Sequence, residues 1–257
     1  MIRIKNEREI DRIRESCRLV VDTFKMIDRV IAVGMTTAEL DRLIADHIKK
    51  VGGYPAFKGY KVGRAVFPAN SCISVEDEVV HGIPSNRKLK AGDIVSVDVG
   101  IKYDGYYGDA AKTYAVGQIS ESKRRLMRET LSALYKGIAK AVAGGRLSDV
   151  SHAIQTHVEG AGYSVVRDLV GHGLGRKLHE DPQVPNYGKP NSGPRLRKGM
   201  VLAIEPMVNA GSAEVYTDGD DWTVRTEDGK PAAHFEHAIV IRDEQAEILT
   251  TGLFEEV

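Results

Sequence analysis

The sequence predicts an α+β protein built from two similar halves. Three observations indicate this: pairs of amphipathic helices recur, a strand hairpin follows each pair, and short motifs repeat at matching places. We expect a single catalytic domain spanning 1–257, in which a pseudo-twofold axis relates halves at about 1–118 and 119–257. Chance similarity between two β-rich stretches is the alternative to such a repeat.

The first half begins with two helices. Residues 8–31 carry apolar side chains at alternating steps of three and four, which is typical of an amphipathic helix. Thr36 and Glu39 then form the T-x-x-E pattern of a capping box, so a second helix begins there and ends at the glycine pair 52–53. Residues 54–71 are rich in turn formers and leave the secondary structure ambiguous.

A hairpin closes the first half. Residues 93–101 read DIVSVDVGI, and their apolar and polar residues alternate as in a strand. With a four-residue loop at 102–105, the register places Asp98 directly opposite Asp109 on one face. Two facing carboxylates in an apolar sheet either share a proton or bind a cation. A solvated strand face and an ion pair with a lysine such as Lys112 are the structural alternatives.

The second half repeats this plan. A long amphipathic helix is expected over 121–143, and Ser148 is expected to cap a shorter helix that runs to Gly160. The motif H-x-x-P occurs once in each half, as HGIP at 81–84 and as HEDP at 179–182. These matches favour a repeated arrangement over chance.

Two glutamates of the second half stand in apolar strand contexts. The segment LRKGMVLAIE at 196–205 is similar to LKAGDIVSVD at 89–98, so Glu205 matches Asp98. A final strand pair carries Glu236 in the context HFEHAIVI. Glutamate is seldom buried without a partner, and a buried arginine is the structural alternative to a metal ion. Several such carboxylates with one or more histidines form the ligand set expected for two divalent ions.

The segment GHGLGRKLHEDP at 171–182 holds His172 and His179 seven residues apart. Its three glycines disfavour a helix, because each costs about 1 kcal/mol relative to alanine. We therefore expect a glycine-rich loop that carries both imidazoles.

Composition excludes several classes of protein. Lysine and arginine balance aspartate and glutamate at 36 each, so neither a nucleic-acid binder nor a membrane-surface binder is expected. The N-terminal stretch resembles no secretory signal, no run of 18 apolar residues occurs, and Cys17 and Cys72 are the two cysteines. Sequence motifs of zincins, dinucleotide-binding proteins, serine hydrolases and EF-hands are absent. A cytoplasmic protein is therefore expected.

Taken together, the motifs HGIP, DVG…GDAAKT, GHGLGRKLHEDP, AIEPM and FEHAIVI resemble those of type 1 methionine aminopeptidases over essentially the whole chain. The resemblance implies the pita-bread fold, in which the two halves surround a curved antiparallel sheet. It also implies two divalent metal ions as cofactors, with cobalt, manganese, iron and zinc as candidates. By motif, Asp109 and Glu236 would bridge the ions, Asp98 would complete the shell of one ion, and His172 and Glu205 would bind the other.

The resemblance also implies roles in metal-assisted hydrolysis. Glu205 would accept a proton from the attacking water. His179 would hydrogen-bond the scissile carbonyl oxygen as charge develops there. His81 would contact the substrate amide from the other side, whereas the structural alternative is a capping or core histidine.

An apolar pocket would select the methionine side chain. By position its walls would be Tyr60, Phe67, Cys72, Leu178 and Trp222. Leu178 stands where many relatives have phenylalanine. Trp222 is the single tryptophan and sits in an acidic loop, so a pocket wall is expected there and a local hydrophobic plug is the alternative.

The implied activity is removal of the N-terminal methionine from peptides and nascent chains, with a preference for a small second residue. A monomer is expected, and contact with the ribosome is left open. One alternative is a peptidase of the Xaa-Pro aminopeptidase or prolidase kind, although those usually carry a large N-terminal domain and only 80 residues precede His81. The other is a non-catalytic pita-bread binding protein, which would be expected to lose metal ligands.

Overall fold

The computed structural model describes residues 1–254. Its helices are α1 (Glu7–Val30), α2 (Thr37–Lys50), α3 (Glu121–Ile138) and α4 (Leu147–Gly160). The strands before α3 are β1 (Tyr54–Pro55), β2 (Lys61–Val62), β3 (Ala65–Val66), β4 (Cys72–Val75), β5 (Glu78–Val80), β6 (Ile94–Tyr103) and β7 (Tyr106–Ala115). Those after α4 are β8 (Ser164–Val165), β9 (Val170–Gly173), β10 (Glu180–Pro185), β11 (Val201–Ile204), β12 (Met207–Asn209), β13 (Val215–Thr217), β14 (Val224–Thr226), β15 (Ala232–His234), β16 (His237–Val240) and β17 (Glu247–Ile248).

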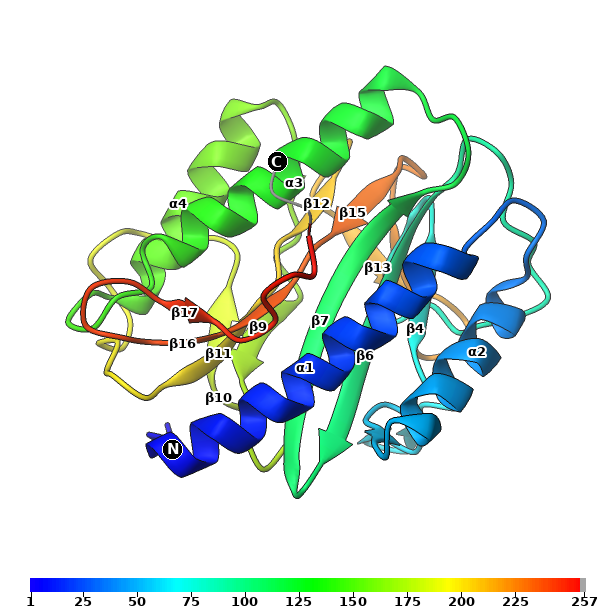
Figure 1. Cartoon of the computed structure of the whole chain (residues 1–257). Helices are drawn as coiled ribbons and strands as arrows, with labels where there is room; N and C mark the ends of the chain where they lie inside the picture. The colour runs from blue at the N-terminus through cyan, green and yellow to red at the C-terminus, as the bar shows by residue number, and fades with distance from the viewer. Residues whose placement is uncertain (255–257) are drawn as a thin grey trace.

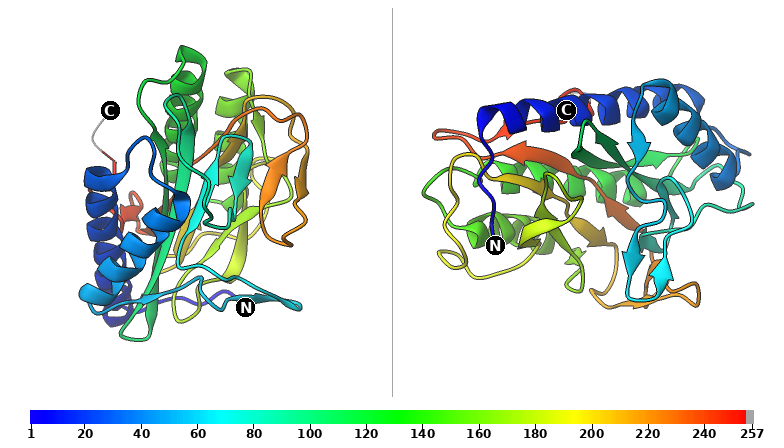
Figure 2. Two further views of the ribbon diagram at one scale, coloured as in Figure 1. Left: turned by 90° about the vertical axis from the view of Figure 1, so that its right-hand side faces the viewer. Right: turned by 90° about the horizontal axis from the view of Figure 1, so that it is seen from below.

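The strands pair antiparallel in several small sheets. In the first half β6 lies between β4 and β7 and also pairs with β1, while in the second half the order is β10-β9-β11-β16-β17. Helix α1 crosses the β6–β7 hairpin, and the β13–β14 hairpin lies on the opposite side of the molecule (Figures 1 and 2). The crossing is close at Gly108, where a Cβ would lie 2.5 Å from the backbone of Ser16 and Cys17.

Two hydrophobic clusters lie mainly in one half each. One packs α1 and α2 against β4, β6 and β7, and another packs α3 and α4 against β11, β12, β15 and β16. A third cluster contains residues of both halves, including Cys17, Phe67, Cys72 and Leu178. None of the helices within residues 1–254 has the length and apolar character needed to span a membrane.

The two helices expected in the first half are confirmed. Helix α1 has a capping box between Asn6 and Glu9, and α2 has the expected one between Thr36 and Glu39. In each box the side chain of one residue accepts from the backbone N–H of the other, which satisfies N–H groups that the helix leaves unpaired.

The helices of the second half differ from the expectation at two ends, while α4 ends at Gly160 as expected. Helix α3 ends at Ile138 rather than at 143. The backbone there changes to hydrogen bonds between residues three apart, and Ala143 N donates to the carbonyl of Arg242. Helix α4 begins at Leu147 with Arg146 as its N-cap, so Ser148 is not the cap. The Ser148 hydroxyl instead accepts a hydrogen bond from the backbone N–H of Ser192 at 2.8 Å.

The predicted register of the β6–β7 hairpin is wrong by two residues. Its turn has two residues, Asp104 and Gly105, with φ of 44° and 81°. An Asp-Gly pair with positive φ is the preferred two-residue hairpin turn, because its twist matches that of the strands. Asp98 therefore pairs with Ala111 rather than with Asp109. The two aspartates still share one face, since a shift of two residues preserves side-chain orientation.

Matching backbone hydrogen bonds occur in the two halves. Gly34 N donates to the carbonyl of Leu89 at 2.8 Å, and Gly144 N donates to that of Leu196 at 2.9 Å. In both cases the segment before the second helix of a half is joined to the segment before a strand, β6 in the first half and β11 in the second. These pairs support the division into halves, which stays a prediction.

Candidate metal centre and substrate cavity

A cavity of about 710 Å³ opens between the two halves. It is lined by all five predicted metal ligands, Asp98, Asp109, His172, Glu205 and Glu236, and by both predicted catalytic histidines, His81 and His179. Its apolar walls include Tyr60, Phe67, Cys72 and Trp222 as predicted, and also Phe57, Val80 and Met207. Leu178 does not line the cavity; it is buried in the same hydrophobic cluster as Phe67 and Cys72.

Four carboxylates converge at this cavity, and we call Asp98, Asp109, Glu205 and Glu236 the acidic cluster. The aspartates come from the paired strands β6 and β7. The glutamates were expected inside strands, but each lies at a break between two strands. Glu205 lies between β11 and β12 next to Pro206, which lacks an N–H for the sheet ladder. Glu236 lies between β15 and β16, and its N–H donates to the carbonyl of Ala111 on β7 at 2.9 Å.

His172 lies in strand β9 rather than in the expected loop. The glycines on either side let β9 lie close to both neighbouring strands. A Cβ on Gly171 would lie 2.4 Å from the carbonyl oxygen of Ala203, and one on Gly173 would lie 2.2 Å from that of Asp181. Glycine is thus required here for close backbone approach, which is a common reason for glycine within a strand.

The His172 ring directs its Nε2 toward the acidic cluster. Its Nδ1 donates to the carbonyl of Gly173 at 3.0 Å, which leaves the lone pair on Nε2. Nε2 lies 3.7 Å from Asp109 Oδ2 and 3.5 Å from Glu205 Oε1. Ligand atoms of Asp109, His172 and Glu236 all lie within 4.8 Å of one another. These distances leave room for a cation between them.

Burial changes the protonation of the site. It raises the pKa of Asp109 to about 7. Burial, followed by the charge of Asp109, holds the pKa values of the other three carboxyl groups of the acidic cluster well above their ordinary values. Burial lowers the pKa of His172 to about 3, so this ring is neutral at physiological pH. The cluster therefore binds either protons or a cation at neutral pH.

The donor set fits divalent metal ions. One oxygen of each of Asp98, Asp109 and Glu236 is buried without a hydrogen-bond partner. Among residues 1–254 no lysine or arginine forms an ion pair with the acidic cluster; the imidazoles of His172 and His234, whose pKa values burial lowers to about 3, lie 3.5–3.7 Å from its oxygens as neutral groups. Lys112, the alternative partner of the aspartates, pairs with Asp28 at 2.7 Å instead. Carboxylates with a neutral imidazole suit several divalent ions.

His179 is held by a tyrosine. The Tyr60 hydroxyl lies 2.5 Å from His179 Nδ1, and the two rings meet edge to face at 4.9 Å. When the hydroxyl donates to Nδ1, the neutral imidazole carries its proton on Nε2. Burial lowers the pKa of His179 to about 4 and, with the charge of His179, that of His81 to about 4.

His234 is a further residue at the site that no motif of the sequence indicated. This residue is 1% exposed, and its Nε2 lies 3.6 Å from Glu205 Oε2. Its backbone is fixed by the Thr113 hydroxyl, which accepts from His234 N at 2.9 Å and donates to His234 O at 2.8 Å. Ser96 Oγ, 2.8 Å from the Thr113 hydroxyl, completes the network as a donor. The motif HFEH contains His234, but its spacing gave no sign of these contacts.

We expect Thr113→Val to weaken both folding and metal binding. The substitution leaves the buried N–H and carbonyl of His234 without partners, which costs about 1–3 kcal/mol per group. It also loosens the strand break that carries Glu236. Urea unfolding and titration with Mn²⁺ would measure the two effects, and Thr113→Ser should restore both.

Thr130→Val is the matched control for this prediction. Thr130 is fully buried, and its hydroxyl donates to the carbonyl of Leu126 within α3. The control should leave Mn²⁺ affinity unchanged. Equal Mn²⁺ affinity in Thr113→Val and the wild type would contradict the role given to this hydroxyl.

The model of metallopeptidase family M24 matches residues 11–243 of the chain. Methionine aminopeptidase of Clostridium acetobutylicum is 53% identical over 251 residues, which are 97% of this chain and 99% of that protein. Methionine aminopeptidase 1 of Bacillus subtilis is 53% identical over 250 residues, with the same two coverages of 97% and 99%.

Solved structures agree with these matches. The crystal structure of methionine aminopeptidase from Thermotoga maritima has a TM-score of 0.94 at 49% identity and covers 97% of this chain and 99% of its own. Prolidase from Pyrococcus furiosus has a TM-score of 0.79 at 23% identity, covering 98% and 66%, which shows a shared fold. The pita-bread fold is thereby confirmed. The chain belongs to metallopeptidase family M24 and, within it, to the methionine aminopeptidases.

Proposed function

We propose that the protein removes the N-terminal methionine from peptides and nascent chains by metal-assisted hydrolysis, with a preference for a small second residue. The observation that carries this function is the acidic cluster, which faces a cavity with apolar walls and has neutral imidazoles rather than lysine or arginine beside it. A free substrate amine would lie near these carboxylates, which accounts for an exopeptidase.

The proposed cofactors are two divalent ions. Asp98, Asp109, His172, Glu205 and Glu236 would hold them, with Asp109 and Glu236 shared between the two. When bound, such ions polarise a carbonyl and make water acidic enough to ionise near neutral pH. The orphaned oxygens of the cluster support this assignment, because each is an acceptor without a donor.

Three side chains of the protein would handle protons and charge. Glu205 would accept a proton from water as a carboxylate that lines the cavity, with its Oε1 3.5 Å from His172 Nε2. His179 would donate from Nε2 to the scissile carbonyl oxygen, because Tyr60 occupies Nδ1. His81 also lines the cavity and would contact the substrate amide from the other side.

The apolar walls would select the first side chain of the substrate. Tyr60, Phe67, Cys72 and Trp222 line this part of the cavity, and the Phe67 and Trp222 rings meet edge to face at 5.2 Å. Leu178 would act from behind this wall through its contacts in the same hydrophobic cluster. An unbranched, flexible methionine side chain suits such a mixed aromatic and sulfur surface.

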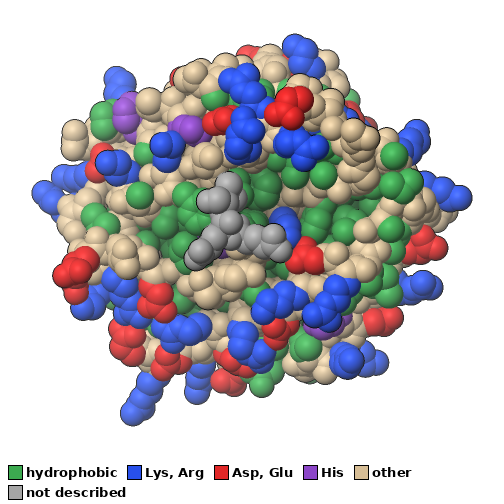
Figure 3. All heavy atoms as spheres, turned by 45° about the horizontal axis from the view of Figure 1, so that its top comes forward, with side chains coloured by type: hydrophobic (Ala, Val, Ile, Leu, Met, Phe, Trp, Pro, Cys, Tyr) green, Lys and Arg blue, Asp and Glu red, His purple; other side chains and the backbone are tan. Residues whose placement is uncertain are grey.

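We also propose that the protein acts as a monomer in the cytoplasm. Cys17 and Cys72 are buried free thiols, which is typical of a reducing compartment. On the face shown in Figure 3, basic and acidic side chains are interspersed, which offers no single-sign surface for nucleic acid. Contact with the ribosome is a separate question that ribosome co-sedimentation would answer.

Peptide cleavage by metal-stripped protein tests the function. Mn²⁺, Fe²⁺, Co²⁺ and Zn²⁺ would be restored separately, with Met-Ala-Ser, Met-Lys-Ser and Ala-Pro-Ser as substrates. Release of methionine from Met-Ala-Ser alone is the expected result. Cleavage of Ala-Pro-Ser instead would assign the chain to the proline-specific branch. If no peptide is cleaved with any of the metals, a non-catalytic binding protein would be favoured.

Metal stabilisation should grow with pH. Because the folded-state pKa of Asp109 is raised to about 7, the stability that its protonated form contributes is present below its ordinary pKa and is lost as pH rises through about 7. A divalent ion replaces that proton, so its apparent affinity should rise about tenfold per pH unit for each proton displaced. His172 stays neutral in this range and does not compete.

The measurement is the increase in Tm on adding Mn²⁺ at pH 5.5 and at pH 7.5. A larger increase at pH 7.5 is expected. An increase that is equal at both values would show that no proton leaves the acidic cluster when the metal binds.

A further inference from the structure

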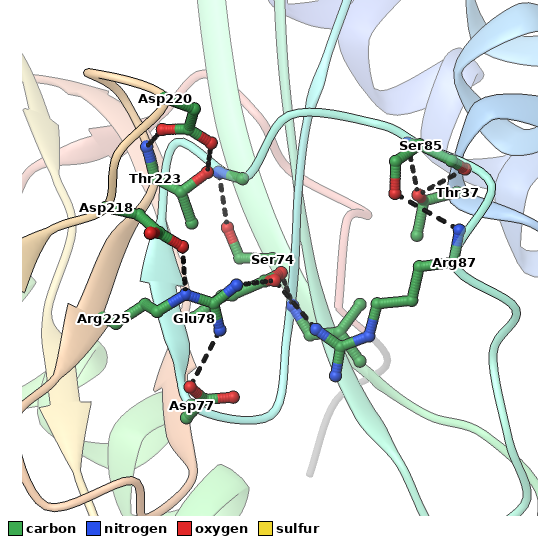
Figure 4. A network of polar contacts seen from close by, with 12 residues as sticks. Thr37, Ser74, Asp77, Glu78, Ser85, Arg87, Asp218, Asp220, Thr223 and Arg225 are labelled. Atoms are coloured by element: carbon green, nitrogen blue, oxygen red, sulfur yellow. Dashed lines mark hydrogen bonds and ion pairs between the residues drawn. The ribbon is translucent and has the colours of Figure 1, made fainter.

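Arg225 joins three carboxylates from two separate parts of the chain (Figure 4). Its Nε donates to Asp218 Oδ2 at 2.7 Å, its Nη1 to Asp77 Oδ2 at 2.8 Å and its Nη2 to Glu78 Oε1 at 2.8 Å. Arg225 lies on β14, Asp218 in the turn before that strand, and the other two carboxylates at the start of β5. One guanidinium therefore ties a strand of the first half to a hairpin of the second.

The same two segments carry cavity residues. Strand β5 ends at Val80, which pairs with Val224 of β14, and His81 follows directly with a φ of 59°. Trp222 lies two residues before Val224. The rings of His81 and Trp222 meet edge to face at 6.4 Å, and both line the cavity. The alignment of β5 with β14 thus sets how these two side chains face each other.

The turn that presents Trp222 is tightly bonded. The Asp220 carboxylate accepts from the backbone N–H of Trp222 at 2.9 Å, from Thr223 N at 2.7 Å and from the Thr223 hydroxyl at 2.6 Å. The backbone that carries the Trp222 side chain is therefore fixed to the turn of the hairpin. Asp218, which Arg225 binds, belongs to this same turn.

Backbone pairing alone holds the two segments weakly. Strands β5 and β14 have three residues each, and their register shifts between Val224 and Arg225. Glu78 is a firm anchor, because its other oxygen accepts from Val75 N at 2.7 Å and its Oε1 also binds Arg87 at 2.8 Å. Charge-assisted bonds of a planar guanidinium are stronger and more directional than ordinary ones.

We propose that Arg225 is a positioning residue for substrate selection, which fixes His81 and Trp222 against each other across the boundary between the halves. Arg225 does not line the cavity, so it acts through these two side chains. The inference rests on the proposed function, since His81 and Trp222 face the substrate in it.

The test compares Arg225→Gln with Arg242→Gln. Arg242 is a matched control, because its side chain has the same exposed fraction of 22% and binds two carboxylates, Glu7 and Glu247, away from the cavity. With Met-Ala-Ser and Leu-Ala-Ser as substrates, Arg225→Gln should raise KM for the first peptide and reduce the preference for it about tenfold. The change in kcat should be smaller than the change in KM, because the acidic cluster is untouched. Arg242→Gln should change none of these values.

Trp222 gives a second measurement that does not depend on activity. It is the single tryptophan of the chain, so fluorescence reports on its surroundings alone. Arg225→Gln should increase quenching of this fluorescence by acrylamide, and Arg242→Gln should not. Asp218→Asn, which removes one of the three contacts, should give smaller changes of the same sign and serves if Arg225→Gln fails to fold.

The outcomes separate the two proposals. An active wild type whose KM, peptide preference and quenching are unchanged by Arg225→Gln would overturn the positioning role. Equal changes in Arg242→Gln would also overturn it, because a general loss of stability would then explain them. A wild type that releases no methionine with any metal would overturn the proposed function instead.

Discussion

Asp109→Asn is expected to abolish methionine release. Asp109 is 2% exposed, and its charge raises the pKa of each other carboxyl group in the acidic cluster, so it lies at the electrostatic centre of the site. The amide removes one charge and one ligand oxygen at once. Metal ions supply several kcal/mol of transition-state stabilisation, so kcat/KM should fall on the order of 10³-fold or more. Peptide assays and metal analysis of the purified variant would measure both losses.

Asp41→Asn is the control for this result. Asp41 is also a buried aspartate, but its oxygens accept from the backbone N–H groups of Asn70 and Ser71, and it lies outside the cavity lining. This variant should lose stability and keep its bound metal. Full turnover and full metal content in Asp109→Asn would contradict the assignment of the metal centre.

His179→Ala is expected to lower kcat without loss of metal. Removal of one donor to a developing oxyanion costs about 10²–10³-fold in kcat. The His179 ring meets Tyr60 and the edge of His172, and its role is donation rather than ligation. The metal content and the Tm gain with Mn²⁺ should therefore stay close to those of the wild type.

His152→Ala serves as the histidine control, because His152 is exposed on α4 and bonds to the carbonyl of Gly188. Unchanged kcat in His179→Ala would contradict the role of His179 as the donor to the scissile carbonyl oxygen. Loss of metal in the same variant would make His179 a ligand instead.

Local patterns predicted much of the fold, and long-range pairing explains what they missed. The capping box of Thr36 and Glu39 is a contact within one turn, so spacing alone located α2 correctly. The β6–β7 register failed because a two-residue and a four-residue loop both fit KYDGYY, and the Asp104–Gly105 turn decided between them. His172 was assigned to a loop because glycine disfavours a helix, yet packing between two strands requires glycine equally.

The candidate site was likewise predicted in part, and long-range contacts account for the rest. Its ligands were predicted from the resemblance of motifs, and the structure brings those side chains to one cavity. The roles of Thr113 and Arg225 depend on partners that are 121 and up to 148 residues away in the chain. No spacing rule connects such positions, because only the folded sheets bring them together.

The most direct test of the metal-dependent activity is one titration of the metal-stripped protein. Bound metal per chain and methionine released from Met-Ala-Ser would be followed together as Mn²⁺, Fe²⁺, Co²⁺ or Zn²⁺ is added. We expect no release without metal, and release that rises with binding and saturates at about two ions per chain. Methionine release by the metal-free protein in excess chelator, or metal binding without release for all four ions, would contradict it.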